Sequence, residues 1–339
     1  MMTHGADIYT YAKIANCSPQ EIIDFSSNIN LYQPNTNITF ANATITKYAQ
    51  SSYDTLKESI ATNYNIKSEQ IALYNGATAA IYALLPQLKP KKVYLYAPLY
   101  GEYEKAAFRA KKFVSKINRI EDIDNPPAKK SIVIFVNPST PEGSYHDMKK
   151  LLKMWMKLEC SIVLDESFLE FEELESAREY IKKYKKLYII QSFSKFYSCA
   201  GVRIGAIFAH KKSIEKLSKE LWNISSLDAH FLQERLCDGD FKKASKELHL
   251  QQKKQLIEIL ESSDIFDEVV ESQSNFILCY SPRGKELFEY LLEHKILVRS
   301  CESFDYLSEN WLRFAVKDSH SQESLKNTLK HFQERHNTH

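Results

Sequence analysis

The chain has 339 residues, 44% of them hydrophobic and 26% charged, with a formal net charge of +2, and is long enough for one large domain or a large and a small one. The nearly balanced charge gives no bulk attraction to nucleic acid, and no apolar run approaches the roughly 20 residues that a membrane-spanning helix needs. The six cysteines lack C-x-x-C spacing and the N-terminus lacks an apolar signal segment, so we expect a cytoplasmic protein with reduced thiols and no bound metal.

Short β-branched or aromatic runs alternate with helical patterns through the first two thirds of the chain. Strands are predicted at 71–74, 93–96, 131–136, 161–164, 187–191 and 205–209, with helices at 79–85, 103–111 and 145–158. Continuous apolar strands that alternate with helices are typical of a mainly parallel sheet covered on both faces. Ligands of such sheets bind at the carboxyl ends of the strands.

The last third of the chain has a different pattern. A helical stretch is expected from about residue 213 to 262, with a break near 237–240. Strands at 268–280 and 312–316 and helices at 284–294 and 321–335 follow. This tail, together with the N-terminal arm, predicts a smaller α/β domain beside the large one.

The turn Asn75-Gly76-Ala77-Thr78 follows a predicted strand and opens a predicted helix. The first turn of a helix presents unpaired N–H groups and a positive dipole end, which suit a phosphate. Many strand–helix turns have this form, so the segment indicates a phosphate site only if other residues that can bind phosphate lie beside it.

Lys195 is flanked by aromatic and small hydroxyl residues, with Arg203 eight positions later and Asp165 thirty positions earlier at a predicted strand end. This lysine suits attachment of pyridoxal 5′-phosphate (PLP) as a Schiff base. Ser192, Ser194 and Arg203 could hold the PLP phosphate, and Asp165 its pyridine nitrogen. The alternatives are a solvated lysine, a surface arginine and an aspartate that caps a turn.

Tyr100 follows another predicted strand and could stack on the PLP ring. Taken alone, it is better explained as a core aromatic, because the chain has twenty tyrosines. Asp165, Ser192 and Gly76 also lie just beyond predicted strand ends, which places them at one edge of a parallel sheet. The sequence therefore predicts a single shared site.

Several segments resemble the fold-type I PLP enzymes of the histidinol-phosphate aminotransferase subfamily, and most closely the branch that contains L-threonine-O-3-phosphate decarboxylase. The segments that carry the resemblance are Thr3-His4-Gly5-Ala6-Asp7, Ser18-Pro19-Gln20, Asp24-Phe25-Ser26-Ser27-Asn28-Ile29-Asn30, Ile296-Leu297-Val298-Arg299-Ser300-Cys301 and Leu312-Arg313-Phe314-Ala315-Val316. The resemblance covers nearly the full length. It implies an α/β fold with an N-terminal arm that joins the small domain (1–47), a large PLP-binding domain with a mainly parallel seven-stranded sheet (48–225), connecting helices (226–262) and a small C-terminal α/β domain (263–339).

The resemblance also implies roles for individual residues. Lys195 and Asp165 correspond to the catalytic pair, the Schiff-base lysine and the partner of the pyridinium. The residues that correspond to the other cofactor contacts are Gly76, Ala77, Thr78, Ser192, Ser194 and Arg203 around the phosphate, and Tyr100 on the ring. Tyr48 corresponds to a tyrosine that reaches the neighbouring subunit's cofactor, which implies a homodimer. Arg313 corresponds to the arginine of the substrate carboxylate, and His4, Asn28 and Arg299 are candidates for the substrate phosphate or carboxylate.

Several positions depart from the family pattern. Thr140 stands where the family has an asparagine that contacts the ring hydroxyl, so either Thr140 or the nearby Asn137 could make that contact. The dimer tyrosine is flanked by Lys47 and Ala49 where arginine and proline are usual. Asp7 adds a carboxylate near the expected phosphate pocket and would favour L-serine phosphate over L-threonine phosphate.

These features together predict a PLP-dependent carboxy-lyase that converts L-threonine phosphate or L-serine phosphate to the amine phosphate, as in cobalamin biosynthesis. Arg313 would orient the carboxylate so that carbon dioxide leaves in preference to the α-proton. The first alternative is an aminotransferase of the histidinol-phosphate type. Phe168 disfavours it, because those enzymes tend to carry a tyrosine there and the decarboxylase branch a phenylalanine. The second alternative is a non-catalytic PLP-binding regulator, which the presence of Lys195 disfavours.

Overall fold

The computed structural model describes residues 7–33, 46–217 and 220–337, and its larger lobe is built on a seven-stranded sheet. The strand order is β2-β8-β7-β6-β5-β3-β4; β8 is antiparallel to both neighbours, and every other adjacent pair is parallel. The strands are β2 (Ile71–Tyr74), β3 (Lys92–Ala97), β4 (Phe113–Asn118), β5 (Ile132–Val136), β6 (Ser161–Asp165), β7 (Leu187–Ser192) and β8 (Gly205–Ala209). The expected mainly parallel sheet is confirmed.

Both faces of this sheet are covered, which is why its inner strands β5, β6 and β8 are buried at every residue. In β5, Ile132, Ile134 and Val136 pack into one core and Val133 and Phe135 into the other, as the two-residue period of a strand requires. The first core contains α3 (Gly76–Gln87) and α4 (Glu102–Arg109), and the second contains α2 (Asp54–Tyr64), α5 (Lys149–Lys157) and α7 (Ser226–Cys237). The short α6 (Lys211–Ile214) follows β8. Two apolar layers thus hold the sheet rigid behind its strand ends.

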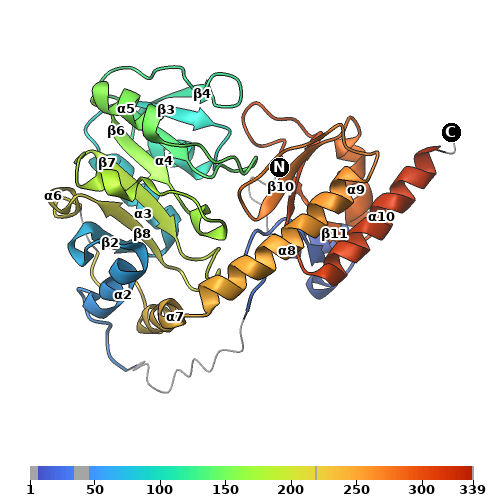
Figure 1. Ribbon diagram of the computed structural model, residues 1–339, viewed down its shortest axis with the longest axis horizontal. Helices are drawn as coiled ribbons and strands as arrows, with labels where there is room; N and C mark the ends of the chain where they lie inside the picture. The colour runs from blue at the N-terminus through green and yellow to red at the C-terminus, as the bar shows by residue number, and fades with distance from the viewer. Residues whose placement is uncertain (1–6, 34–45, 218–219, 338–339) are drawn as a thin grey trace.

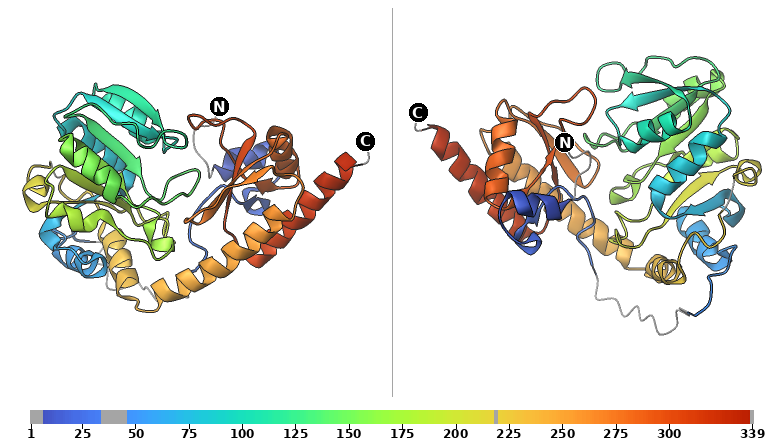
Figure 2. Two further views of the ribbon diagram at one scale, coloured as in Figure 1. Left: turned by 45° about the horizontal axis from the view of Figure 1, so that its top comes forward. Right: turned by 180° about the vertical axis from the view of Figure 1, so that it is seen from behind.

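The smaller lobe is built on an antiparallel sheet in the order β12-β13-β10-β9. Its strands are β9 (Glu268–Val269), β10 (Phe276–Tyr280), β12 (Arg299–Ser300) and β13 (Trp311–Ala315), and its helices are α9 (Gly284–Glu293) and α10 (Ser319–Asn337). The N-terminal β1 (Ile23–Asp24) pairs in parallel with β11 (Ile296–Leu297) of this lobe, after α1 (Ile8–Ile14). The long α8 (Phe241–Glu261) runs from the large lobe to the small one, as Figures 1 and 2 show. The domain boundaries expected from the sequence stay a prediction.

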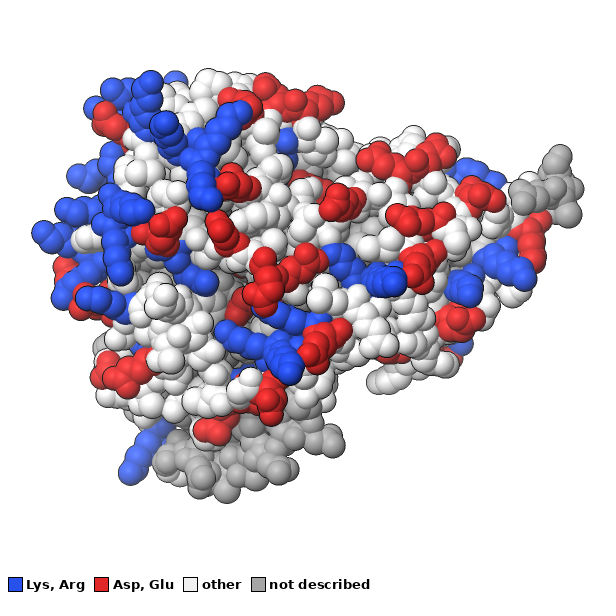
Figure 3. Space-filling view, in the orientation of Figure 1, with Lys and Arg blue, Asp and Glu red and all other residues white. Residues whose placement is uncertain are grey.

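Four short 3-10 helices complete the described secondary structure. They are η1 (Pro19–Glu21), η3 (Ser68–Gln70), η4 (Leu169–Phe171) and η5 (Ala177–Ile181). On the face shown in Figure 3, lysine and arginine side chains gather along the left edge of the large lobe, and charges of both signs are mixed over the remainder. Within the described ranges, no helix combines the length and the apolar character needed to cross a membrane.

The structure differs from the predicted elements in several places. β4 was not predicted, because an edge strand buries only part of its residues and Phe113 is exposed. The predicted helix from about 213 is wrong over most of 215–225: α6 ends at Ile214, and α7 begins at Ser226 with Ser225 as its N-cap. The stretch 268–280 forms two strands with an irregular segment between them.

Candidate active site

The residues expected to bind PLP follow strands whose ends meet at one edge of the large sheet. Asp165 ends β6, Ser192 ends β7, and Gly76 comes two residues after the end of β2. Because β8 runs antiparallel, its first residue, Gly205, lies opposite both Ser192 and Tyr74 at the same edge. The edge therefore gathers residues from four strands, where ligands of α/β sheets bind.

The start of α3 and the segment before β8 form a cradle. Gly76 has a φ of +81°, and a Cβ at this position would lie 2.7 Å from Arg203 Nη2. A Cβ at Gly205 would lie 2.3 Å from the Ala77 nitrogen, so β8 can approach the helix start only with glycine there. Arg203 Nη1 donates to Ser194 Oγ at 3.1 Å. Helix N–H groups, a hydroxyl and an exposed guanidinium thus converge on a place where an anion fits.

Two further expected contacts lie beside this cradle. Thr78 Oγ1 and Tyr100 Oη are 3.5 Å apart, and the two residues are partly buried. Burial raises the pKa of Tyr100, while the hydrogen bond with Thr78 and the charge of Arg203 lower it. The Tyr100 hydroxyl is therefore placed beside Thr78, near the start of α3 that is expected to hold the cofactor phosphate.

Asp165 is a buried carboxylate with two hydrogen-bond donors. The Ser167 N–H donates to Oδ1 at 2.9 Å, and Tyr103 Oη donates to Oδ2 at 2.7 Å. Burial raises the pKa of Asp165, whereas the donors Ser167 and Tyr103 and the charge of Lys195 oppose that rise. Asp165 therefore both caps its turn and keeps a carboxylate that a pyridinium N–H could engage.

Lys195 follows β7 and its amino group faces Phe168. The Nζ atom lies 5.4 Å from the centroid of the buried Phe168 ring. Desolvation of the amino group, reinforced by the charge of Arg313 and opposed by Asp165, lowers the pKa of Lys195 to about 8. An amine with this pKa has a substantial neutral fraction near neutral pH, and only the neutral amine is a nucleophile.

An N-terminal segment fastens the Lys195 loop to the small lobe. The Asn30 N–H donates to Lys195 O at 2.9 Å, and Asn30 Nδ2 donates to Phe196 O at 2.6 Å. Asn28 is buried, and its carbonyl accepts from Asn275 Nδ2 at 2.8 Å. The segment that was matched to the family by its residues thus spans the two lobes and carries Asn28 between them.

Arg313 and Arg299 are direct cross-strand partners on β13 and β12. Arg313 donates to Thr140 Oγ1 and to Ser26 O, both at 3.0 Å, and Arg299 donates to Ser303 Oγ at 2.9 Å. Burial lowers the pKa of Arg313 to about 10, and the charge of Arg299 acts in the same direction. Like charges opposite each other on adjacent strands are unfavourable, so the pair is suited to an anion that neutralises both.

The side chain of Asn137 is occupied by main-chain groups. Its Nδ2 donates to His146 O at 2.9 Å, and its Oδ1 accepts from His146 N at 2.8 Å. Thr140 accepts from Arg313 with its hydroxyl oxygen, and within the described ranges no acceptor takes the Thr140 proton. Of the two candidates for the ring hydroxyl, Thr140 is therefore the one whose side chain can still donate a hydrogen bond.

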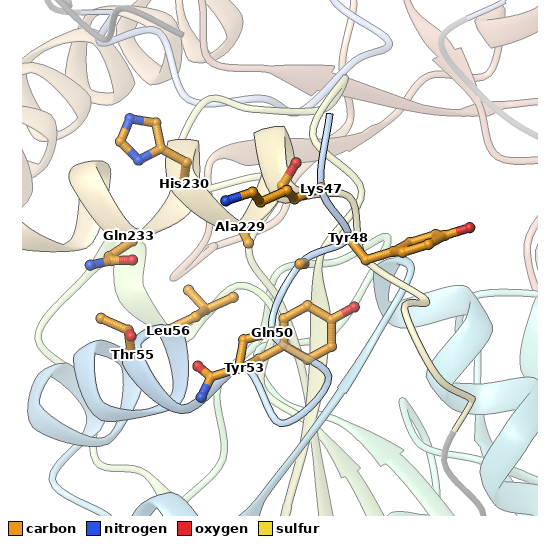
Figure 4. Close-up of a pocket in the computed structure, with 11 residues that line it drawn as sticks. Lys47, Tyr48, Gln50, Tyr53, Thr55, Leu56, Ala229, His230 and Gln233 are labelled. Carbon is orange, nitrogen blue, oxygen red and sulfur yellow. The ribbon is translucent and has the colours of Figure 1, made fainter. Parts of the chain in front are cut away.

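Tyr48 lies apart from these residues. It is 81% exposed and stacks on Trp222 with ring centroids 4.7 Å apart. It borders a cavity of about 300 Å3 beside α2 and α7, and Figure 4 shows its ring directed away from His230 and Gln233. His4 lies outside the described residues. The carboxylate of Asp7 accepts from Thr10 N and Thr10 Oγ1, so Asp7 caps α1.

Sequence reasoning missed three buried residues around the site. Tyr103, the donor to Asp165, stands three positions after Tyr100 in the first turn of α4, and this spacing was a usable signal. Arg119 and Glu142 form a buried ion pair behind Thr140, and no local pattern connects residues so far apart. The residues present fit PLP: a glycine-lined cradle for its phosphate, a buried carboxylate for its ring nitrogen and a lysine with a lowered pKa.

Comparisons with known proteins agree with this arrangement. A model of the family aminotransferase class I and II matches residues 20–332. The adenosylcobalamin biosynthesis bifunctional protein CobDQ of Leptospira interrogans is 32% identical over 339 residues; the match covers 93% of this chain but 39% of that protein, so this chain spans about two fifths of its length. A putative threonine-phosphate decarboxylase of Caldanaerobacter subterraneus is 27% identical, over 93% of this chain and 89% of that one. The crystal structure of histidinol-phosphate aminotransferase from Clostridium acetobutylicum is 28% identical and superposes with a TM-score of 0.82, over 92% of this chain and 99% of the other.

Proposed function

The chain belongs to the aminotransferase class I and II family of PLP-dependent enzymes, and from this premise we propose that it decarboxylates an O-phospho-L-amino acid, L-threonine phosphate or L-serine phosphate. The products would be carbon dioxide and the corresponding amine phosphate. The cofactor, pyridoxal 5′-phosphate, supplies an electron-withdrawing ring that accepts electron density from the substrate Cα.

We assign the cofactor contacts to residues at the edge of the large sheet. Lys195 would hold the cofactor aldehyde, Asp165 its ring nitrogen, Tyr100 its ring face and Thr140 its ring hydroxyl. The phosphate would be held by Gly76, Ala77, Thr78, Ser192, Ser194 and Arg203. This assignment is supported by the convergence of these residues, and by glycines where a Cβ would collide with Arg203 or with the start of α3.

The observation that carries the proposed substrate class is the placement of Arg299 opposite Arg313. Both side chains are buried, each is already anchored by a hydroxyl, and the charge of Arg313 acts on Lys195. A phosphorylated amino acid brings two anionic groups into this space, one for each guanidinium. We propose that Arg313 holds the carboxylate and that Arg299, with Asn28 and His4, holds the phosphate.

Holding both ends of the substrate fixes rotation about its Cα bonds, and this rotation decides which bond breaks. When the Cα–carboxylate bond breaks, its electron pair stays on Cα and a proton must replace the lost carboxylate. The Lys195 amine, with a pKa of about 8, can hold that proton near neutral pH. Orientation by the arginines would thus select decarboxylation over loss of the α-proton.

The ring that faces Lys195 favours decarboxylation over transamination. Phe168 offers an apolar ring at 5.4 Å from Nζ and no hydroxyl that could take part in proton transfer. The alternative remains an aminotransferase of the histidinol-phosphate type, because the structure also superposes on such an enzyme. The two reactions differ in their products, so one assay separates them.

Tyr48 supports a homodimer as part of the proposal. Its ring is largely exposed and directed away from the cavity that it borders. We propose that Tyr48 reaches the cofactor phosphate of a second copy of the chain, so that each active site needs two subunits.

Product analysis tests the proposed reaction. The purified holoenzyme is incubated with L-threonine phosphate, with L-serine phosphate, or with histidinol phosphate plus 2-oxoglutarate, and carbon dioxide and glutamate are measured in parallel. We expect carbon dioxide from one or both phosphoamino acids, and none from a Lys195→Ala control. Glutamate without carbon dioxide would make the protein an aminotransferase.

A further inference from the structure

Arg119 and Glu142 form an ion pair inside the large lobe, away from solvent. Arg119 Nε lies 3.0 Å from Glu142 Oε1, and the two side chains are 1% and 6% exposed. The guanidinium also donates to Val136 O at 2.8 Å and lies 4.2 Å from the centroid of the Phe135 ring. Arg119 is therefore held against the end of β5 with the Glu142 carboxylate within its reach.

Glu142 belongs to the loop that leads from β5 to Thr140 and beyond. The loop closes on itself, because Gly143 N donates to Ser139 O at 3.1 Å and Ser139 N donates to Ser144 O at 2.9 Å. Thr140 and Glu142 both lie within this closed turn, two residues apart. Because the turn is closed, an interaction that holds the Glu142 carboxylate in place also holds Thr140 in place.

Thr140 in turn contacts an arginine of the other lobe. Arg313 Nη1 donates to Thr140 Oγ1 at 3.0 Å across 173 positions of the sequence. The contacts run in order from Arg119 to Glu142, through the turn to Thr140, and on to Arg313. The chain of contacts begins behind β5 and ends at a guanidinium of the candidate active site.

A buried ion pair is a poor source of stability, because desolvating both charges costs about as much as their attraction returns. Replacing such a pair by two apolar side chains of similar volume often costs a protein no stability, so stability is a weak reason for the pair. What an ion pair adds is a fixed direction for both side chains. We propose that Arg119 and Glu142 are positioning residues, which hold Thr140 where it orients Arg313 for the substrate carboxylate.

This inference rests on the proposed function in one respect, the assignment of the substrate carboxylate to Arg313. A binding experiment on the holoenzyme separates the two. The ligands are 3-phosphooxypropanoate, which is the L-serine phosphate skeleton without its amino group, and propyl phosphate, which also lacks the carboxylate. Neither can react, so their dissociation constants, measured by titration calorimetry, report recognition alone.

The main variant replaces both partners, Arg119→Met with Glu142→Leu, and so leaves no unpaired charge. We expect it to bind 3-phosphooxypropanoate about tenfold more weakly and propyl phosphate with unchanged affinity, since one charge-assisted contact is misaligned. Thr140→Val should cause a similar loss, and Thr140→Ser should restore affinity. Combining Thr140→Val with the double variant should add little further loss, because residues that act through one contact are not additive.

Lys112→Met is the matched control, because Lys112 is a second buried cation beside the same edge strand β4. Its Nζ donates to the carbonyls of Leu88 and Pro90, and it has no contact with the Thr140 turn. This variant should melt at a lower temperature and bind both ligands as the wild type does. If the main variant fails to fold, Glu142→Gln takes its place, because glutamine keeps the shape of the side chain and removes its charge. We expect this variant to bind 3-phosphooxypropanoate about threefold more weakly and propyl phosphate with unchanged affinity.

The possible results separate the two proposals. If a folded Arg119/Glu142 variant binds both ligands as tightly as the wild type, the positioning role is wrong and the proposed function stands. If it loses affinity for both ligands equally, the pair is a structural element without a role in carboxylate recognition. If the wild type itself does not prefer the carboxylate ligand, Arg313 does not bind the substrate carboxylate and both proposals fall.

Discussion

Replacing Gly76 by alanine should damage PLP binding in a way that the structure makes quantitative. The residue has a φ of +81°, a conformation that costs an L-amino acid about 1–2 kcal/mol, and this cost falls on the apoenzyme and the holoenzyme alike. The new Cβ would lie 2.7 Å from Arg203 Nη2, so the guanidinium must move away from the cradle. Losing one charge-assisted hydrogen bond costs about 1.5–3 kcal/mol, or roughly ten- to a hundredfold in PLP affinity.

Two measurements separate these effects. Thermal unfolding of the apoenzyme reports the backbone strain, and titration of the apoenzyme with PLP, followed by its visible absorbance, reports the loss of the Arg203 contact. Gly201→Ala is the control, because no atom lies within 4 Å of its added Cβ and its φ is not positive. If Gly76→Ala melts at a lower temperature and still binds PLP like the wild type, Arg203 does not hold the cofactor phosphate.

Three further predictions concern the amine, the buried carboxylate and the subunit interface. PLP should attach to the apoenzyme at a rate that rises with pH and levels off above about 8, because the neutral Lys195 amine is the nucleophile. Arg313→Met removes a charge that lowers the pKa of Lys195, so the pH profile of the PLP attachment rate, measured by stopped flow, should shift to higher pH. An unshifted profile would show that the charge of Arg313 does not act on Lys195. Tyr103→Phe removes a hydrogen-bond donor that lowers the pKa of Asp165, so the acid limb of the profile of kcat against pH should move to higher pH. If the variant and the wild type have the same acid limb, this hydrogen bond has no part in the mechanism. Sedimentation should show a dimer, and mixing Lys195→Ala with Tyr48→Phe subunits should restore activity above that of either variant alone, since one site of each mixed dimer has both residues. A fully active monomer would rule out the shared site.

Local signals were enough to predict the scaffold and the cofactor cradle. Apolar runs bounded by turn residues predicted β2 and β8 at their observed limits, because a strand buried on both faces needs an uninterrupted apolar segment. The order of strand, glycine turn and helix predicted Gly76 at a helix start, and strand ends predicted Asp165 and Ser192 at one edge. The roles of these residues toward PLP stay predictions, whereas the fold that brings them together is confirmed.

Only the tertiary structure shows which side chains distant in the sequence contact each other. The register of β12 on β13 places Arg299 opposite Arg313, and a one-residue slip would send one of them to the other face of the sheet. The contact of Arg313 with Thr140 likewise depends on how the two lobes meet. Residue type restricts which contacts a side chain can make, but the packing of separate elements selects the one that forms.

The same distinction explains which residues of the site escaped prediction. A strand, a turn or a helix start is encoded within a few neighbouring residues, because backbone conformation and burial are local requirements. Arg119 and Glu142 satisfy no local requirement: a lone arginine after an edge strand and a lone glutamate after a proline are ordinary surface residues until the fold buries them against each other. The sequence alone thus determined the class of fold and which edge of the sheet gathers the residues predicted to bind the cofactor. The tertiary structure decided which charges meet, because only folding removes the water that would otherwise separate them.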